Sequence, residues 1–394
     1  MFELARLFLK LGFIAFGGPA AHIAMMEEEV VRRRGWMTRQ HFLDLVGATN
    51  LIPGPNSTEM GLHVGYERAG PGGLAVAGIC FIGPAVLVTG IFAWLYVEFG
   101  TLPRVEPFLY GVKPAVLVLV LVAVWRLGRR AITGPRLAVL GVAVLAAVLA
   151  GVGEVSALLG GGVVGAIWTR LSDRRPPSDD MPGTDRGERR GVRASSFAGI
   201  LPISILAAPL VQTAAAGVPL HRLGLFFLKV GAVLYGSGYV LIAFLRGDLV
   251  DRFGWLTEAQ LLDAIAIGQF TPGPILSTAT FVGYVLEGVP GAAVATLGIF
   301  LPSFLFVLIL NPLVPRLRDH VWTAAFLDAV NVAAVALMLA VTLQLGASSL
   351  TTWPAWVIAG IAGVAAWRFD AGPVWLIAGG ALVGRVLAVW AGPI

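Results

Sequence analysis

The chain has 394 residues, of which 57% are hydrophobic and 13% charged, with a formal net charge of +5. Soluble domains carry about 25% charged residues, so this composition excludes an ordinary soluble protein and indicates a polytopic membrane protein. The single cysteine, Cys80, excludes an intramolecular disulfide and a cysteine-based metal site. No GxxxxGKS/T loop is present, which argues against an ATP-hydrolysing pump. The excess positive charge lies in loops, as membrane topology requires, and does not indicate nucleic-acid binding.

The apolar windows predict an all-α fold with about thirteen candidate spans. We interpret the first, which begins MFELARLFLKLGF, as a retained segment rather than a signal peptide, because it has no small-residue cleavage site. Residues 170–196 predict a charged, solvated cytoplasmic linker between an N-terminal repeat (1–169) and, after an extra connecting span (197–216), a C-terminal repeat (217–394). The windows fall near 4–26, 41–65, 74–97, 107–127, 136–152, 155–169, 197–216, 223–245, 261–286, 291–313, 325–346, 353–368 and 373–391.

The two sides of the linker repeat each other. A shift of 219 positions superposes FLKLGFIAFGG on FLKVGAVLYGS. The same shift superposes Pro53-Gly54-Pro55 on Pro272-Gly273-Pro274, and Pro71-Gly72 on Pro290-Gly291. One register over such a length indicates a duplicated unit.

The placement of arginines predicts that the two units are inverted. Arginines crowd the connection after the fourth span of the first half, whereas in the second half Arg316 and Arg318 crowd the preceding connection. Because cytoplasmic loops attract Lys and Arg, we expect an inverted repeat with the N-terminus and the linker in the cytoplasm. Arg32–Arg34 would lie outside if residues 4–26 crossed fully, so whether that segment or 41–65 is a re-entrant hairpin stays open.

Each half contains a helix breaker within apolar sequence. Pro53 and Pro55 remove backbone donors, and broken backbone at membrane depth is tolerated only where protein or water surrounds it. Pro55 and Pro274 fit the first turn of a new helix, whose N–H groups and positive dipole end bind oxyanions. Asn56, Ser57 and Thr58 would lie in such a turn. The alternative is a pair of proline kinks that only shape the helix bundle.

Small-residue breaks and lysines add to this pattern. Gly17-Gly18-Pro19 and Gly236-Ser237-Gly238 either permit close helix packing or line the same cavity as the breakers. Lys10 and Lys229 occupy the same repeat position within apolar segments. They either extend their amines to the membrane surface or supply the charge that a buried divalent anion requires.

Four further groups are candidates for proton coupling. His22 and Glu59 lie in apolar windows, and Asp44 and Asp263 share one repeat position. The two aspartates either pair with arginines or take part in proton coupling, and both alternatives stay open. Glu59 and His63 are four residues apart, but without a further clustered ligand we expect neither a metal nor a cofactor. We interpret Glu27–Glu29 beside the nearby arginines as a solvated interfacial cluster.

The paired glycine-rich and Pro-Gly-Pro motifs resemble the chromate ion transporter family, in its long two-half type. The resemblance implies a prokaryotic inner-membrane carrier that exports chromate, confers chromate resistance and is driven by the membrane potential or a proton gradient. Sulfate is a close analogue of that substrate. The resemblance places these residues in motif regions: Gly17, Gly18, Pro19, Asn50, Pro53, Gly54, Pro55 and Thr58, with the counterparts Gly236, Ser237, Gly238, Gln269, Pro272, Gly273, Pro274 and Ser277.

We therefore predict a secondary carrier for chromate in which one half rocks against the other, without enzymatic activity; a homodimer stays open. The nearer alternative is a sulfate transporter of the same architecture. The remote alternative is an intramembrane enzyme that uses Ser57 with His63 or His22. The expected substrate-binding residues are Lys10, Gly17, Gly18, Asn50, Gly54, Asn56, Ser57, Thr58, Lys229, Gly236, Ser237, Gly238, Gln269, Thr271, Gly273, Ser277 and Thr278.

Overall fold

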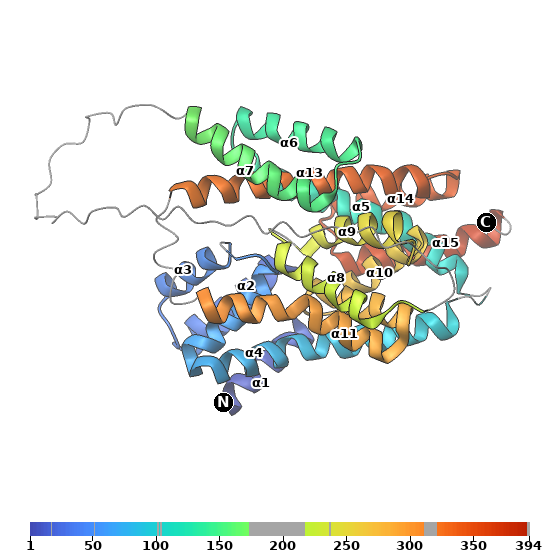
Figure 1. Cartoon of the computed structure of the whole chain (residues 1–394). Helices are drawn as coiled ribbons and strands as arrows, with labels where there is room; N and C mark the ends of the chain where they lie inside the picture. Colours follow the sequence, from blue (N-terminus) through green and yellow to red (C-terminus); the bar gives the residue numbers. More distant parts are fainter. Residues whose placement is uncertain are drawn as a thin grey trace, which may run out of the picture.

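The computed structural model describes residues 1–16, 18–50, 52–100, 102, 105–172, 217–235, 238–310 and 321–391, and in these ranges the regular structure is entirely helical (Figure 1). The predicted span 197–216, and all but residues 170–172 of the predicted linker, lie outside these ranges. The first half contains α1 (Phe2–Ile14), α2 (Pro19–Glu27), η1 (Glu28–Arg33), α3 (Arg39–Thr49), α4 (Asn56–Phe99), α5 (Glu106–Ala131), α6 (Pro135–Leu149) and α7 (Glu154–Ser172). The second half contains α8 (Leu220–Val233), η2 (Gly238–Val240), α9 (Leu241–Phe244), η3 (Leu245–Arg252), α10 (Glu258–Phe270), η4 (Ile275–Ser277), α11 (Thr278–Leu310), α13 (Val321–Ser349), α14 (Trp353–Arg368) and α15 (Pro373–Ala391).

The first helices of each half form a hairpin. Lys10 of α1 lies 2.7 Å from Glu29 of η1, and Glu3 lies 3.4 Å from Arg34, so the chain reverses between α1 and α2. In the second half Lys229 of α8 pairs with Asp248 of η3. The buried apolar faces of α1 and α8 follow the helical period at matching positions: Leu4, Leu7, Phe8 and Leu11, then Leu223, Phe226, Phe227 and Val230.

A second hairpin follows in each half. In the first half, the His41 ring of α3 lies 3.3 Å from Glu67 of α4, so these helices also lead to a tip, where Asn50 and residues 52–55 lie. The chain reverses again within α4, where Gly70 has a φ of +61° that favours glycine. A Cβ atom on Gly65 would lie 2.6 Å from the Cβ of Ala77, although residues this far apart on a straight helix are well separated.

This second turn corrects one part of the sequence register. The matching turn of α11 is at Gly288, with a φ of +62°, so the structural shift there is 218 and not 219. The reason is that PGPNSTEMGLHVGY in the first half faces the shorter PGPILSTATFVGY in the second. The residues from Gly65 onward therefore pair at a shift of 218, which includes Pro71 and Gly72, paired with Pro290 and Gly291 by the constant shift.

The two halves lie antiparallel and meet at their hairpin tips. Leu74, early in the second arm of α4, shares a buried cluster with Val307 near the end of α11. At the opposite end, the rings of Tyr96 and Phe281 are 5.1 Å apart. The long arms of α4 and α11 therefore run in opposite directions, side by side in Figure 1.

Two backbone hydrogen bonds join the tips across the halves. The Gly54 N–H donates to the carbonyl oxygen of Leu234 at 2.6 Å, and the Gly273 N–H donates to that of Ala15 at 2.8 Å. Gly54 and Gly273 have φ angles of +144° and +90°, a region that favours glycine. Each breaker thus connects to the first hairpin of the other half.

Four helices of the described ranges are long and apolar enough to cross a membrane: Asn56–Phe99, Glu106–Ala131, Ile275–Ile309 and Trp322–Ser349. The estimate of about thirteen spans is not confirmed. Its windows measured apolar length, whereas the window 4–26 contains a chain reversal. A helix such as α1, with 13 residues, reaches only about 20 Å, short of the roughly 30 Å hydrocarbon core.

Candidate functional site

A cavity of about 280 Å³ opens beside the tip of the second hairpin of the first half. It is termed the tip pocket. Its walls come from this tip, from the first hairpin of the second half, from the end of α5 and from α13. The lining residues are Asn50, Asn56, Leu127, Arg130, Ala131, Thr133, Val240, Asp328, Asn331, Ala334, Val335 and Met338.

The two asparagines of the tip pocket hold each other in place. Pro55 precedes α4 in an extended conformation, so Asn56 is the first helical residue. The Asn56 Nδ2 donates to Asn50 Oδ1 at 2.7 Å, and the Asn50 Nδ2 donates to the carbonyl oxygen of Val46 at 3.3 Å. The helix start thus brings two amide side chains to the pocket, and both belong to the predicted binding set.

Four polar lining residues lie outside the predicted set: Arg130, Thr133, Asp328 and Asn331. Arg130 lies in the last turn of α5, and the sequence indicates only its bearing on topology. Asp328 and Asn331 are three residues apart on α13, so they lie on one face of that helix. Polar residues at that spacing within the apolar window 325–346 were the available signal. The tip pocket therefore contains one guanidinium and one carboxylate among its amides.

The polar residues of the second breaker pack inside the protein instead. Thr89 of α4 donates to Ser277 Oγ at 3.1 Å and lies 3.3 Å from Thr271 Oγ1. The hydroxyls of Thr271 and Thr278 donate to the carbonyl oxygens of Ile267 and Ile275. Thr271, Ser277 and Thr278 are all buried, and none of them lines the tip pocket.

The backbone N–H groups of the breaker glycines also have hydrogen-bond partners within the protein. The N–H groups of Gly54 and Gly273, which the sequence reading directed at an oxyanion, donate to carbonyl oxygens of the other half. Ser57 and Thr58 are buried behind Asn56, with Pro53 in the same tip. The remaining breaker positions are found as follows: Pro19 begins α2, Pro272 lies in the second tip, and Pro274 precedes η4.

The glycine breaks are only partly described. Gly17, Gly236 and Ser237 lie outside the described residues. Gly18 has a φ of +83° and precedes α2. Gly238 and Gln269 border a cavity of only about 10 Å³, and Gln269 Oε1 accepts a hydrogen bond from the Tyr239 hydroxyl at 3.2 Å.

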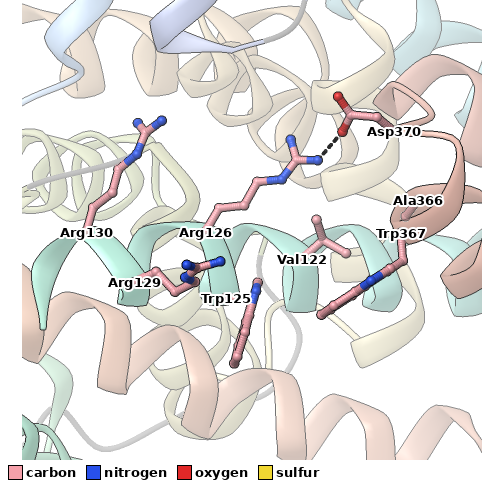
Figure 2. Close-up of a pocket in the computed structure, with 8 residues that line it drawn as sticks. All are labelled: Val122, Trp125, Arg126, Arg129, Arg130, Ala366, Trp367 and Asp370. Atoms are coloured by element: carbon pink, nitrogen blue, oxygen red, sulfur yellow. Dashed lines mark hydrogen bonds and ion pairs between the residues drawn. The ribbon is translucent and has the colours of Figure 1, made fainter.

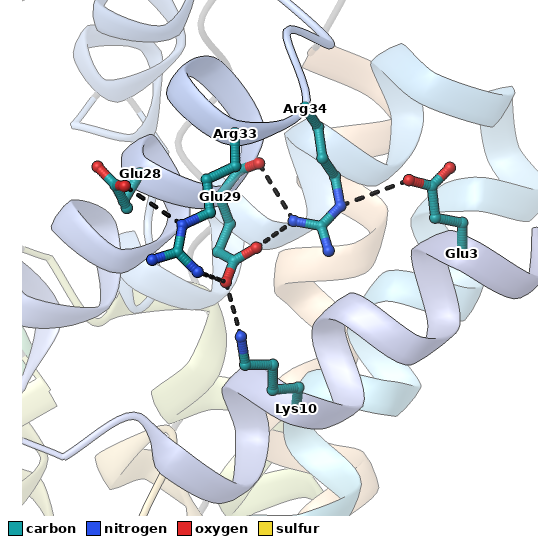
Figure 3. Close-up of polar contacts among 6 residues, drawn as sticks. All are labelled: Glu3, Lys10, Glu28, Glu29, Arg33 and Arg34. Atoms are coloured by element: carbon teal, nitrogen blue, oxygen red, sulfur yellow. Dashed lines mark hydrogen bonds and ion pairs between the residues drawn. The ribbon is translucent and has the colours of Figure 1, made fainter.

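Lys10 and Lys229 do not line the tip pocket; each pairs with an acid. Figure 3 shows Lys10 directed at Glu29, with Arg33 and Arg34 on the same carboxylate. The hydrogen bonds from Lys10 and Arg34 lower the pKa of Glu29. Glu29 is buried, whereas the sequence reading had assigned the whole acidic group to solvent.

The second half repeats this pair at the same positions. Lys229 pairs with Asp248, and Arg252 lies 3.6 Å from the same carboxylate. The shift of 219 links Glu29 with Asp248, so the duplicated acid was the signal that could have identified both partners. The charge of the two lysines is thus compensated within the protein.

Three of the predicted proton-coupling groups have a polar partner within hydrogen-bond distance. The Tyr96 hydroxyl donates to Asp263 Oδ2 at 2.9 Å, and Gln40 donates to Asp44 at 3.3 Å. The Nε2 atom of His22 lies 3.0 Å from the carbonyl oxygen of Ala15, which also accepts the hydrogen bond from Gly273 of the second tip. Within the described part of the chain, no group of three or more His, Cys, Asp or Glu side chains could hold a metal ion.

Glu59, the fourth group, has a different environment. It is fully buried, and neither carboxyl oxygen has a hydrogen-bond partner among the described residues. A Cβ atom on Gly54 would collide with Glu59 Oε1 and lie 2.6 Å from Ser303 Oγ, so both side chains face this tip. Ser303, on α11, is likewise buried, and its hydroxyl has no hydrogen-bond partner in the described part of the chain. A buried carboxylate without compensation is costly, so the site suits an acid that carries its proton.

Comparisons with known proteins agree with this architecture. The profile of the chromate transporter family matches residues 2–166 and again residues 221–385. A chromate transport protein of Pseudomonas aeruginosa is 32% identical over 394 residues, covering 97% of this chain and 91% of that protein. No solved structure matches the chain.

Two further relatives are similar over nearly the whole chain. A probable chromate transport protein of Synechococcus elongatus is 31% identical, covering 93% of this chain and 90% of that protein. A chromate transport protein of Cupriavidus metallidurans is 30% identical, covering 98% of this chain and 92% of that protein.

Proposed function

Because the chain belongs to the chromate transporter family, we propose that it is a secondary carrier that exports chromate, a tetrahedral divalent oxyanion. The tip pocket is the observation that carries the proposal. It combines Asn50, Asn56 and Arg130 beside a broken helix start, where hairpins of both halves meet.

The chemistry of the tip pocket suits such an anion. Each Asn side chain carries two N–H donors, and Arg130 can donate two parallel hydrogen bonds to neighbouring oxygens. Asn56 lies at the positive end of a helix dipole. Asp328 opposes the anion, so oxyanion binding is favoured when that carboxyl carries a proton.

The hairpins support alternating access across a bilayer. Each half would send two re-entrant hairpins to mid-depth, from opposite sides, so that the tips meet near the midplane. The chain would lie in the prokaryotic inner membrane with its N-terminus and the linker 170–196 in the cytoplasm. Rocking of one half against the other would open the tip pocket to each side in turn.

Glu59 is the group that best fits proton coupling. It is fully buried at the same tip, beside the hydrogen bond that joins Gly54 to the other half. Movement of one half against the other would change its access to water, and the carboxyl could then release its proton. Asp263 and His22, in contrast, already have polar partners.

Transport by purified protein in sealed vesicles tests the proposal. Radiolabelled chromate should enter the vesicles when a proton gradient or membrane potential is imposed, and sulfate should compete with it for binding but be transported more slowly. Equal or faster sulfate transport would make the protein a sulfate carrier. The absence of any oxyanion flux from a folded, correctly inserted protein would overturn the transport proposal.

A further inference from the structure

A second and larger cavity lies on the other side of Arg130. It has a volume of about 530 Å³ and is termed the arginine pocket (Figure 2). Its residues come from the last turns of α5 and from the end of α14 with the following loop. They are Val122, Trp125, Arg126, Arg129, Arg130, Ala366, Trp367 and Asp370.

The charges of this cavity favour an anion. Arg126, Arg129 and Arg130 follow the spacing that places residues on neighbouring positions of one helix surface. Asp370 is the single acid among the lining residues, and it pairs with Arg126. Like charges at this spacing repel one another. A divalent anion offsets the repulsion among three guanidinium groups more than a monovalent anion does.

Arg130 lines both cavities, whereas Arg126 lines only the arginine pocket. In Figure 2, the side chains of Arg126 and Arg130 extend from α5 toward the same side. An anion held by Arg126 and Arg130 could therefore shift to Arg130 and Asn56 without losing every cationic contact. Because Arg is always charged and presents a planar fork of donors, it suits this exchange of partners.

We propose that the arginine pocket is a second binding site for a tetrahedral divalent oxyanion, from which the anion passes through Arg130 into the tip pocket. This inference rests on the proposed function, since the arginine pocket would be the site that the anion occupies before it reaches the tip pocket.

The pair between Arg126 and Asp370 sets the strength of the second site. Asp370 lies in the loop after α14, has a φ of +50° and keeps its side chain largely exposed. An arriving oxyanion competes with this carboxylate for the Arg126 guanidinium. Removing the carboxylate strengthens the site, and removing the guanidinium weakens it, so substitutions at the two ends of one ion pair act in opposite directions.

A lipid phosphate shares the tetrahedral oxyanion chemistry. Trp125 and Trp367 are largely exposed, and their rings lie 6.0 Å apart at one edge of the cavity, as aromatic residues at membrane interfaces do. The transported anion is favoured because Arg130 lines both this cavity and the tip pocket. The test therefore separates a dissolved anion from a lipid headgroup.

Equilibrium binding of radiolabelled sulfate to the full chain in lipid nanodiscs tests the inference. In zwitterionic lipid, the wild-type protein should bind two sulfates per chain. Arg126→Gln should weaken one site about tenfold, the scale of a lost charge-assisted hydrogen bond. Asp370→Asn should strengthen the same site severalfold. Arg368→Gln is the matched control: it removes one exposed positive charge on α14 outside both pockets and should leave both sites unchanged.

The outcomes distinguish this inference from the proposed function. One sulfate per chain, with Arg126→Gln and Asp370→Asn both silent, would overturn the second site and leave the tip pocket intact. Loss of the second site in nanodiscs with anionic phosphatidylglycerol would assign it to a lipid headgroup and overturn the transfer route. If the wild-type protein bound neither sulfate nor chromate, the proposed function itself would be overturned, and the second site with it.

Discussion

The two Pro-Gly-Pro tips have related sequences but different surroundings. In the first tip, Asn56 lines the tip pocket, and the buried Glu59 has no hydrogen-bond partner within the described ranges. In the second, Ile275 follows the breaker, and Ser277 accepts a hydrogen bond from Thr89. Both tips nevertheless donate a glycine N–H to the other half.

The comparison separates what the repeat preserves from what it does not. The fold keeps the hairpins, the tip glycines and the lysine–carboxylate pairs, because each joins segments of the backbone. The polar side chains after the breaker differ, and the second half is one residue shorter there. Duplication thus accounts for the framework, whereas the candidate binding chemistry belongs mainly to the first half.

The largest expected effect is at the tip glycines. Gly54→Ala would place a Cβ atom against Glu59 and Ser303 at a φ of +144°, so we expect at least about 3 kcal/mol of destabilisation from strain and overpacking together. Gly18→Ala is the control, because its φ of +83° is also strained but its surroundings are open. Thermal unfolding of both variants measures the difference.

Gly273→Ala should fall between these two variants. Its Cβ atom would lie 3.0 Å from the Cβ of Ala85, a contact that a small shift relieves. If Gly54→Ala unfolded at the same temperature as Gly18→Ala, the packing described for the first tip would be wrong.

A smaller effect is expected from the acid in the tip pocket. Asp328 lines the same cavity as Arg130 and carries the opposite charge. Sulfate should bind more tightly as the pH falls, because protonation of Asp328 removes its repulsion of the anion. Sulfate is the suitable probe, since it stays divalent where chromate takes up a proton.

Asp328→Asn should bind sulfate about as tightly at neutral pH as the wild type does at acidic pH, and with little dependence on pH. Asn331→Asp should have the opposite effect and weaken binding. Equal pH dependence in Asp328→Asn and the wild type would exclude Asp328 as the titrating group. Isothermal titration with sulfate at several pH values makes the measurement.

The smallest effect is expected at the ion pairs of the first hairpins. Lys10 and Arg34 lower the pKa of Glu29, so its contribution to stability is present above the usual glutamate pKa and is lost as the pH falls through the lowered value. Glu29→Gln should therefore destabilise the protein by about 1 kcal/mol at neutral pH. The difference should vanish in acid.

Asp248→Asn gives the comparison in the second half, where Lys229 and Arg252 are the partners. Thermal unfolding against pH measures both variants. A Glu29→Gln effect that persisted unchanged in acid would mean that packing, and not the ion pair, stabilises this hairpin.

The sequence predicted the duplicated unit and the helix breaks because glycine, proline and a constant shift record them directly. It did not predict the direction of the chain at each break, since apolar length does not distinguish a crossing from a reversal. The register past the breaker was wrong because a constant shift does not allow for the one-residue difference between the two segments, which the equivalent packing of Gly65 and Gly283 establishes.

The candidate site was predicted only in part. Asn50 and Asn56 follow from their place at a helix start, which is a local property. Arg130 and Asp328 reach the same cavity from α5 and α13, and sequence distance does not reveal such convergence. The lysines were expected to face the substrate, but a buried acid on the neighbouring helix takes that charge.

The central claim is that the first tip binds the transported anion. Chromate flux into sealed vesicles by Asn56→Ile and Ile275→Asn tests it most directly, because each variant gives one tip the residue of the other. We expect Asn56→Ile to lose at least about tenfold in flux and Ile275→Asn to retain most of it. Full flux by a correctly folded Asn56→Ile protein, or equal losses in both variants, would contradict the claim.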